Sequence, residues 1–355
     1  MPLQFQKKKT ERTNPQNLLP SLRKIYFVCP LCRGELEVFD DGYLCLTCRK
    51  KYSLHDGIPD FRVFPDPFLD YREDYERTEI VLDALEKYDL EKLLEHYWGF
   101  SDITPEVLRP KFVRSAMLGE YRAKRTLEFL DEKLNVPIKN VLEIGSGTGN
   151  LLSAAASHYE NIIGIDIAMR WLHISRRRFM DLGVEVPPLV CCCAEFLPFA
   201  DNSFDLIVAS STLEFVRDQP KVLSECARTL DKDGTLYLNS VNRFSLGKDP
   251  YAYLWGIGFL PRRWQAKYVR WRRDASYENV NTLSFGELKS IADEFFAAKS
   301  FSLPEVPESV LKEFSAGTRM QIHGYRKLKK LPFFSAILKR FGPGWDVILQ
   351  KKKNK

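Results

Sequence analysis

Hydrophobic residues in the second half of the chain form short continuous runs that are separated by amphipathic stretches. The runs NVLEI (140–144), NIIGIDIA (161–168) and PLVCCC (188–193) have the length and composition of strands that are buried on both faces. Strand and helix patterns continue to alternate beyond these runs, which is typical of a parallel sheet. A helix and strand over 284–303 and a closing strand over 344–352 complete a predicted α/β fold, a doubly wound, mostly parallel sheet of seven strands.

The rest of the pattern divides the chain further. Residues 1–22 carry basic side chains without an apolar segment, which predicts a disordered tail rather than a secretory signal. Short strand patterns with a turn between them predict a small β-rich unit over 23–65. Apolar residues at three- and four-residue spacing predict a helical linker or lid over 66–136. The α/β domain then covers 137–352, and an aromatic and basic insertion at 242–278 interrupts its alternation.

Composition is that of a folded protein without a membrane-spanning helix. Of the 355 residues, 45% are hydrophobic and 28% are charged, and no run of 18 apolar residues could cross a bilayer. We therefore expect a cytoplasmic protein. The net charge is +6, and cations gather at 7–9, 262–273, 326–330 and the C-terminus. Such clusters are typical of contacts with RNA, anionic lipid or phosphorylated substrates, and equally of solvated faces.

Four of the eight cysteines fall in two C-x2-C pairs, CPLC and CLTC, that are separated by twelve residues. Tetrahedral zinc needs four converging ligands, and two such pairs on hairpins form a zinc ribbon. A unit of about 40 residues has a weak core of its own, which favours a structural metal over a metal-free ribbon or two disulfides. The predicted zinc ligands are Cys29, Cys32, Cys45 and Cys48.

A glycine-rich loop, GSGTG (145–149), follows the first strand of the predicted sheet. Glycine is needed where φ is positive or where a ligand must approach the backbone. Glu143 ends the strand, and its carboxylate is a poor neighbour for a pyrophosphate but a good one for a cofactor with an ammonium and a sulfonium. Asp166 ends the next strand, where it can accept hydrogen bonds from two ribose hydroxyls or cap the following helix.

Together, the segments VLEIGSGTGN, GIDIA, AEFLPFADNSFDLIVASSTLEFV and RTLDKDGTLYL resemble the class I S-adenosylmethionine-dependent methyltransferases, in particular the type 11 group that includes quinone-biosynthesis enzymes. The resemblance spans about residues 137–243 and implies S-adenosylmethionine as the cofactor. It implies that the glycine loop and the carboxylate before it hold the methionine part and that the second acidic residue holds the ribose. The cofactor-binding residues that it predicts are Glu143, Gly145, Ser146, Gly147, Gly149, Asp166, Ile167, Cys193, Ala194, Glu195 and Ser210.

The run CCC at 191–193 ends the third predicted strand. Adjacent residues of a strand point to opposite faces, so the run is a poor metal site and a good set of small buried hydrophobes. In the family that the chain resembles, an aspartate that accepts a hydrogen bond from the adenine amine stands where this chain has Cys193. Thiols are weak acceptors, so the adenine is expected to depend on the backbone near Ala194 and on apolar contacts with Ile167 and Leu197.

The residues that serve the acceptor are less well defined. Glu214, just beyond the fourth strand, is the candidate catalytic base, and its alternative role is to cap the following helix. The insertion mixes tyrosines and tryptophans with arginines, and it resembles methyltransferases that act on glycans or lipid-linked sugars. We therefore expect in-line methyl transfer to a small molecule, glycan or lipid-linked acceptor. A basic amphipathic helix at 327–341 adds the prediction of a peripheral membrane contact.

Two other functions are consistent with the sequence. An RNA methyltransferase, acting on rRNA or tRNA, would bind RNA through the zinc ribbon and the basic clusters. A non-catalytic scaffold would bind the cofactor without transferring its methyl group. The segment RKKYSLHDGIPDF (49–61) resembles a family of small zinc ribbons that serve as methyltransferase adaptors, which implies a protein partner for the ribbon.

Overall fold

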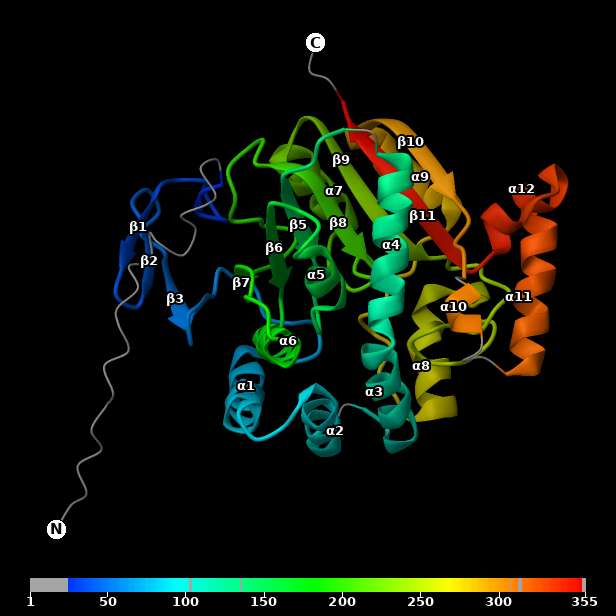
Figure 1. Cartoon of the computed structure of the whole chain (residues 1–355), viewed down its shortest axis with the longest axis horizontal. Coiled ribbons are helices and arrows are strands. Elements are labelled where there is room, and N and C mark those ends of the chain that lie inside the picture. Colours follow the sequence, from blue (N-terminus) through cyan, green and yellow to red (C-terminus); the bar gives the residue numbers. More distant parts are fainter. Residues whose placement is uncertain (1–24, 102–103, 135, 307, 312–314, 353–355) are drawn as a thin grey trace.

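A seven-stranded sheet forms the centre of the computed structural model, which describes residues 25–101, 104–134, 136–306, 308–311 and 315–352 (Figure 1). The strand order is β7 (Leu189–Cys191), β6 (Asn161–Asp166), β5 (Asn140–Ile144), β8 (Phe204–Ser210), β9 (Leu230–Val241), β11 (Gly344–Lys351) and β10 (Phe296–Ser302). Neighbours from β7 to β9 are parallel, and β11 runs antiparallel to both of its neighbours. The structure confirms the predicted α/β fold, whereas the predicted tail at 1–22 lies outside the described residues.

Helices cover both faces of this sheet because successive side chains of the buried strands point to opposite sides. On one face, Leu142 of β5 shares a core with α7 (Gln219–Thr229) and α9 (Phe285–Phe295). On the other face, Val141 shares a second core with α4 (Gly119–Lys133), α5 (Asn150–Ala155) and α6 (Met169–Leu182). The strand order reverses between β5 and β8, and ligands of such sheets bind beyond the carboxyl ends of the strands at this point.

Three further helices precede α4 in the chain, namely α1 (Tyr71–Leu85), α2 (Leu90–Phe100) and α3 (Arg109–Met117), with the short 3-10 helix η2 (Glu106–Leu108) before α3. Asp70 caps α1 in a reciprocal capping box with Glu73, and Asp89 caps α2, so both start positions follow from local sequence. Apolar residues of α1, α2 and α3 share a core with Ile174 of α6. These helices therefore lie against the α6 side of the sheet (Figure 1).

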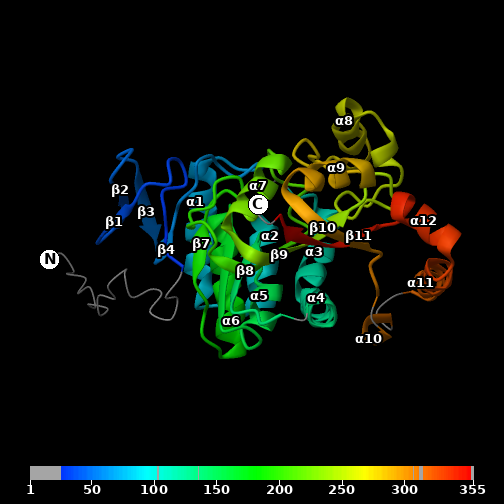
Figure 2. The same cartoon turned by 90° about the horizontal axis from the view of Figure 1, so that it is seen from above.

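The N-terminal unit is a four-stranded antiparallel sheet made of β1 (Leu36–Phe39), β2 (Gly42–Cys45), β3 (Lys51–His55) and β4 (Ile58–Pro59). It lies beside edge strand β7 (Figures 1 and 2). The N–H of Phe61 donates to the carbonyl of Cys191 at 2.8 Å, and Phe27 forms an antiparallel bridge with Phe199. This small unit therefore covers backbone groups of an edge strand that would otherwise be exposed.

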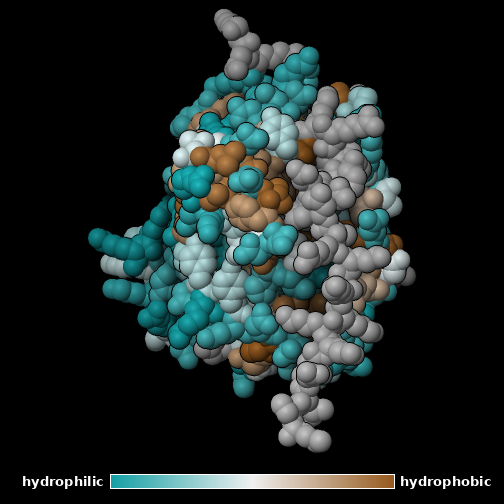
Figure 3. Space-filling view, turned by 90° about the vertical axis from the view of Figure 1, so that its left-hand side faces the viewer, coloured by the Kyte–Doolittle hydropathy of each residue, from teal (hydrophilic) through white to brown (hydrophobic). Residues whose placement is uncertain are grey.

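The N-terminal unit has no separate hydrophobic core. Most of its buried apolar side chains, Tyr43, Tyr52 and Phe61 among them, belong to the same core as the sheet residues beneath α7 and α9, whereas Ile58 of β4 belongs to the core on the other face. This side of the molecule is mostly hydrophilic, with a compact hydrophobic area in its upper half and a smaller one near its lower edge (Figure 3). Leu31 and Leu46, one from each C-x2-C pair, are about half exposed.

Two elaborations lie near the other edge of the sheet. The insertion after β9 contains η3 (Ile257–Phe259) and α8 (Arg262–Arg273), and it has a small core of its own. After β10 come α10 (Glu308–Leu311), α11 (Ala316–Lys329) and α12 (Pro332–Phe341). The prediction of a single helix over 327–341 is wrong, because Pro332 lacks the N–H that a continuous helix needs and starts a new one. No helix in the described part of the chain is both long and apolar enough to span a bilayer.

The shared core leads to a prediction about stability. Phe61 is fully buried, and its ring lies 5.1 Å from each of the rings of Phe27, Tyr43 and Tyr52. Phe61→Ala should lower the free energy of unfolding of the zinc-loaded protein by about 3–5 kcal/mol, measured by urea denaturation followed by circular dichroism. The control, Leu31→Ala on the exposed tip, should change it by about 0.5 kcal/mol or less. Equal effects of the two substitutions would show that the ribbon and the sheet do not share a core.

Candidate functional site

The four cysteines of the C-x2-C pairs meet at one point of the N-terminal unit. Their sulfur atoms all lie within 4.8 Å of one another, and the Sγ–Sγ distances are 3.6 Å for Cys29–Cys48 and 3.4 Å for Cys32–Cys45. Sulfur ligands of tetrahedral zinc, at about 2.3 Å from the metal, lie about 3.8 Å apart. The four thiols therefore fit a zinc ion, as predicted for a zinc ribbon.

Neighbouring groups favour the thiolate form at one of the four ligands, Cys45. Burial opposes ionisation of Cys45, but donors that include the backbone N–H groups of Cys48 and Thr47 lower the pKa of its thiol to about 6. The hydroxyl of Tyr52 lies 3.2 Å from the Sγ of Cys29 and can donate to it. Such outer contacts orient the ligands of a metal site.

The glycine loop follows the carboxyl end of β5 and leads into α5. All three glycines have positive φ, at 72° for Gly145, 50° for Gly147 and 74° for Gly149. A Cβ atom at Gly145 would lie 2.3 Å from the Oγ1 of Thr212, and one at Gly149 would lie 2.2 Å from the Oγ of Ser175. The nearest protein atom to a Cβ at Gly147 would be the carbonyl oxygen of Gly145, at 4.0 Å. Two glycines therefore allow close packing, whereas Gly147 leaves room for a ligand.

The loop borders a cavity of about 280 Å³ at the carboxyl ends of the central strands. Its walls come from the loops after β5, β6, β7 and β8 and from a segment that precedes α1. Gly145, Gly147, Asp166, Ile167, Ala194 and Glu195 line it, and all six were predicted to bind the cofactor. The cavity therefore brings together predicted residues that are up to 50 positions apart in the chain.

Acidic groups give this cavity its electrostatic character. The two carboxylate oxygens of Asp166 accept from the N–H groups of Gly147 and Ala168, both at 2.9 Å. Burial outweighs these donors and raises the pKa of Asp166 to about 6. Burial, and then the nearby charge of Asp166, raise the pKa of Glu143 well above its usual range.

Several buried polar atoms beside the loop have no hydrogen-bond partner among the described residues. They include the Oε2 of Glu143 and the Oγ of Ser146. Buried polar groups are nearly always paired, so these atoms indicate a polar ligand. An ammonium group and ribose hydroxyls would supply the donors that these acceptors lack, so the residues fit S-adenosylmethionine.

The structure does not bring Cys193 into the cavity. Its Sγ accepts from the N–H of Val63 and donates to the carbonyl of Phe64, each at 3.4 Å. Cys192 lines the cavity instead, and the Sγ of Cys191 donates to the carbonyl of Ile167 at 3.5 Å. The three neighbouring cysteines therefore have three different environments.

The residues predicted around the end of β8 are also placed behind the cavity wall. Ser211 and Thr212, not Ser210, line the cavity. Glu214 is buried, and its Oε1 accepts from the Oγ of Ser240 at 2.9 Å and from the N–H of Val241 at 2.6 Å. Its Oε2 has no partner among the described residues, and burial raises the pKa of its carboxyl. In this arrangement Glu214 ties the loop after β8 to the end of β9.

Sequence patterns did not reveal the segment that closes the cavity on its outer side. Residues 60–68, here called the strap, lead from the ribbon to α1 without regular structure, and Phe64, Asp66, Pro67 and Phe68 line the cavity. The guanidinium of Arg217 lies 4.1 Å from the ring centre of Phe64 and donates to the carbonyl of Pro65 at 2.9 Å. In the sequence, the strap is marked only by a run of aromatic, proline and acidic residues, which has neither the helix nor the strand periodicity that sequence analysis detects.

The fold and the cavity agree with the predicted S-adenosylmethionine-dependent methyltransferase domain, and comparisons with known proteins support this interpretation for part of the chain. Residues 142–238 match the family model described as a methyltransferase domain. The ubiquinone biosynthesis O-methyltransferase of Hahella chejuensis is 30% identical over 131 residues, which are 37% of this chain and 53% of that protein. The enzyme of the same name from Saccharophagus degradans is 26% identical over 179 residues, or 50% of this chain and 69% of that protein.

Solved structures include a phosphoethanolamine N-methyltransferase 2 of Haemonchus contortus in complex with S-adenosylhomocysteine. It has a TM-score of 0.45 and 16% identity, with 81% of this chain and 61% of that chain covered. The chain thus spans about half the length of the Hahella relative and about two thirds of the other two proteins.

The loop geometry predicts a selective effect at one glycine. A Cβ at Gly147 would point into the cavity, whereas a Cβ at Gly183, the C-cap of α6 with φ of 64°, would meet no atom within 4 Å. Gly147→Ala and Gly183→Ala should each destabilise the protein by about 1–2 kcal/mol, because both residues have left-handed backbones. Only Gly147→Ala should weaken the binding of S-adenosylhomocysteine, by tenfold or more in calorimetry. Equal affinity of Gly147→Ala and Gly183→Ala for S-adenosylhomocysteine would show that the cofactor does not bind beside Gly147.

The raised pKa of Asp166 predicts how cofactor affinity depends on pH. The carboxylate must be ionised to accept from two hydroxyls, so affinity should fall as pH decreases through about 6. At pH 5, S-adenosylhomocysteine should bind about tenfold more weakly than at pH 7 to 8, because the pH is then one unit below the pKa. Asp166→Asn should bind weakly at every pH and lack the inflection near 6. An unchanged inflection in Asp166→Asn would assign it to another group, with Glu143 the first candidate.

Proposed function

We propose that the protein transfers a methyl group from S-adenosylmethionine to a small acceptor that is partly apolar and carries negative charge. The observation that supports this proposal best is the cavity around Gly147, with two buried carboxylates beside it. When bound, the cofactor would supply a methyl group already activated for displacement. The chain would contribute alignment and the exclusion of water.

The roles of individual residues in this proposal follow from their positions. Asp166 would accept from the ribose hydroxyls, and Glu143 would balance the positive charge at the methionine end. Cys192 and Ala194 would face the adenine through apolar contact and backbone groups. Phe64 and Phe68 of the strap would keep water from the reacting atoms.

The acceptor would enter beside Phe215, Ser211 and Thr212. Phe215 lines the cavity, and its ring packs against the ring of Tyr251 in the insertion, 4.8 Å from centre to centre. The hydroxyl of Tyr251 is buried without a partner among the described residues and could donate to an acceptor. The relatives named as O-methyltransferases support an oxygen atom as the methyl acceptor.

We further propose that the acceptor is delivered from a membrane surface. Exposed apolar residues of the insertion and of α12 adjoin one another, since Trp255 donates through Nε1 to the carbonyl of Leu246 and the N–H of Leu246 donates to the carbonyl of Phe341. Trp255 and Phe259 stack at 6.5 Å, and arginines and lysines flank the patch at 262–263 and 339–340. Apolar side chains ringed by cations suit an anionic bilayer.

Transfer of labelled methyl groups tests the acceptor class. The protein, given S-adenosylmethionine with a tritiated methyl group and a cell extract, should label material that partitions into organic solvent from the membrane fraction. Gly147→Ala should abolish this labelling, and Gly183→Ala should retain it. Label in the RNA fraction would instead favour the RNA methyltransferase, and binding of the cofactor without any labelling would favour the non-catalytic scaffold.

A further inference from the structure

The strap joins the zinc ribbon to the cofactor cavity through a short stretch of chain. Phe61 pairs with β7 through its backbone, and four residues of the next seven line the cavity. Between these two parts stands Arg62, whose side chain is fully buried. Few arginines are buried without partners, so its contacts indicate what it does.

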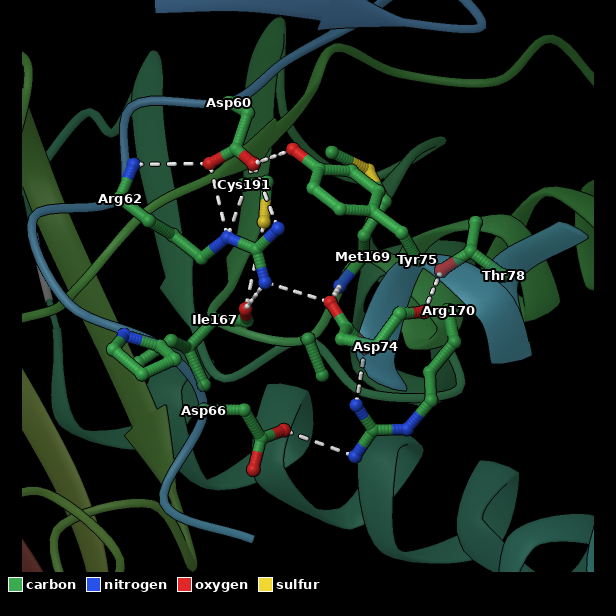
Figure 4. Close-up of polar contacts among 12 residues, drawn as sticks. Asp60, Arg62, Asp66, Asp74, Tyr75, Thr78, Ile167, Met169, Arg170 and Cys191 are labelled. Atoms are coloured by element: carbon green, nitrogen blue, oxygen red, sulfur yellow. Dashed lines mark hydrogen bonds and ion pairs between the residues drawn. The ribbon is translucent and has the colours of Figure 1, made fainter. Parts of the chain in front are cut away.

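Arg62 connects three separate segments (Figure 4). Its Nε and Nη2 donate to the carboxylate of Asp60, at 2.9 Å and 2.7 Å for the closest pairs. Its Nη1 donates to the Oδ2 of Asp74 in α1 at 2.6 Å and to the carbonyl of Ile167 at 3.2 Å. Ile167 lines the cavity directly after Asp166, so one guanidinium fixes both the strap and the loop that carries the ribose-binding carboxylate.

A second arginine completes the network on the opposite side of Asp74. Arg170 donates to Asp74 and, through Nη2, to the Oδ2 of Asp66 at 2.9 Å (Figure 4). Asp74 also accepts from the N–H of Met169 at 3.1 Å, at the start of α6. Asp66 and Arg170 both line the cavity. The network therefore reaches the cavity at three points, counting Ile167.

Stability alone does not explain such a network. Three carboxylates and two guanidinium groups lose most of their hydration here, and apolar side chains of similar volume often give equal or greater stability than a buried ion network. A set of directional hydrogen bonds does, however, determine geometry. Apart from the Tyr97 hydroxyl of α2, which accepts from the Nε of Arg170 at 2.8 Å, each acceptor belongs to the strap, to α1 or to the loop after β6. The strap and the loop after β6 line the cavity.

The zinc site is linked to this network through Tyr52 and Phe61. The hydroxyl of Tyr52 lies 3.2 Å from the Sγ of Cys29, and the Tyr52 ring packs against the Phe61 ring at 5.1 Å. Phe61 immediately precedes Arg62. The four-cysteine site therefore positions the side chains that fix the N-terminal end of the strap.

We propose that the zinc ribbon anchors one wall of the cofactor site, with Arg62 as the positioning residue that aligns the strap with the loop at Ile167. The inference rests on the proposed function only in taking S-adenosylmethionine as the ligand. Arg62 does not touch the cofactor in this account. It acts by holding the strap and the Ile167 carbonyl, so its loss reduces affinity without removing any group that contacts the ligand.

The test uses the full chain and measures the dissociation constant of S-adenosylhomocysteine by calorimetry, with circular dichroism to verify the fold. Arg62→Met should bind tenfold or more weakly, and Arg62→Lys, which keeps the charge but loses the branched donors, should fall between it and the native protein. Arg228→Met is the control, because the Arg228 side chain is only 9% exposed and is paired with Glu225 and Asp201, but it contacts neither the strap nor Ile167. It should bind normally.

Zinc removal provides an independent measurement. Protein treated with a chelator should bind S-adenosylhomocysteine tenfold or more weakly, and added zinc should restore the affinity. Native affinity in folded Arg62→Met, or in folded zinc-free protein, would overturn the inference. If Arg62→Met or the zinc-free protein loses its fold, the affinity of Arg62→Lys for S-adenosylhomocysteine is the deciding measurement. Native affinity in Arg62→Lys would also overturn the inference. Absence of binding by the untreated native protein would instead refute the proposed function.

Discussion

The backbone pairing of Asp60 and Phe61 with Cys191 determines how the two parts of this protein fit together. β7 is a three-residue edge strand, and its outer backbone groups need partners. The chain that leaves the ribbon supplies them, and in doing so it places the strap over the carboxyl end of the same strand. One short pairing thus covers the sheet edge, merges the ribbon with the core and closes the cofactor cavity.

The three cysteines of this edge strand show why small apolar residues are needed there. Cys192 faces the cavity, where a larger side chain would occupy the ligand's space. The Sγ of Cys191 contacts the carbonyl of Ile167 at 3.5 Å, and the Sγ of Cys193 contacts backbone groups of the strap at 3.4 Å. Burial raises the pKa of all three thiols, so they stay protonated and behave as small packing residues.

Local patterns were sufficient to predict the sheet, the zinc ligands and the glycine loop. The periodicity of 140–144 and 161–168, the two C-x2-C pairs and the carboxylate before Gly145 each depend on a few neighbouring residues. The environment of Cys193 could not be predicted in this way, because it depends on Val63 and Phe64, 130 and 129 positions away. The network of Arg62, Asp74 and Arg170 was missed for the same reason, since its members belong to three elements and share no motif.

The same network bears on how the cavity recognises a cation. Glu143 precedes the loop by two positions and Asp166 accepts from the N–H of Gly147 at 2.9 Å, and burial raises the pKa of both carboxyls. Arg62 and Arg170 do not relieve this cost for Glu143, because their donors are directed at Asp60, Asp66 and Asp74. The Oε2 of Glu143 therefore has no partner among the described residues, and the raised pKa favours the neutral carboxyl while no positive charge lies beside it. A ligand with an ammonium, which the methyl donor and its demethylated product both carry, would supply a donor to that oxygen and lower the pKa of the Glu143 carboxyl.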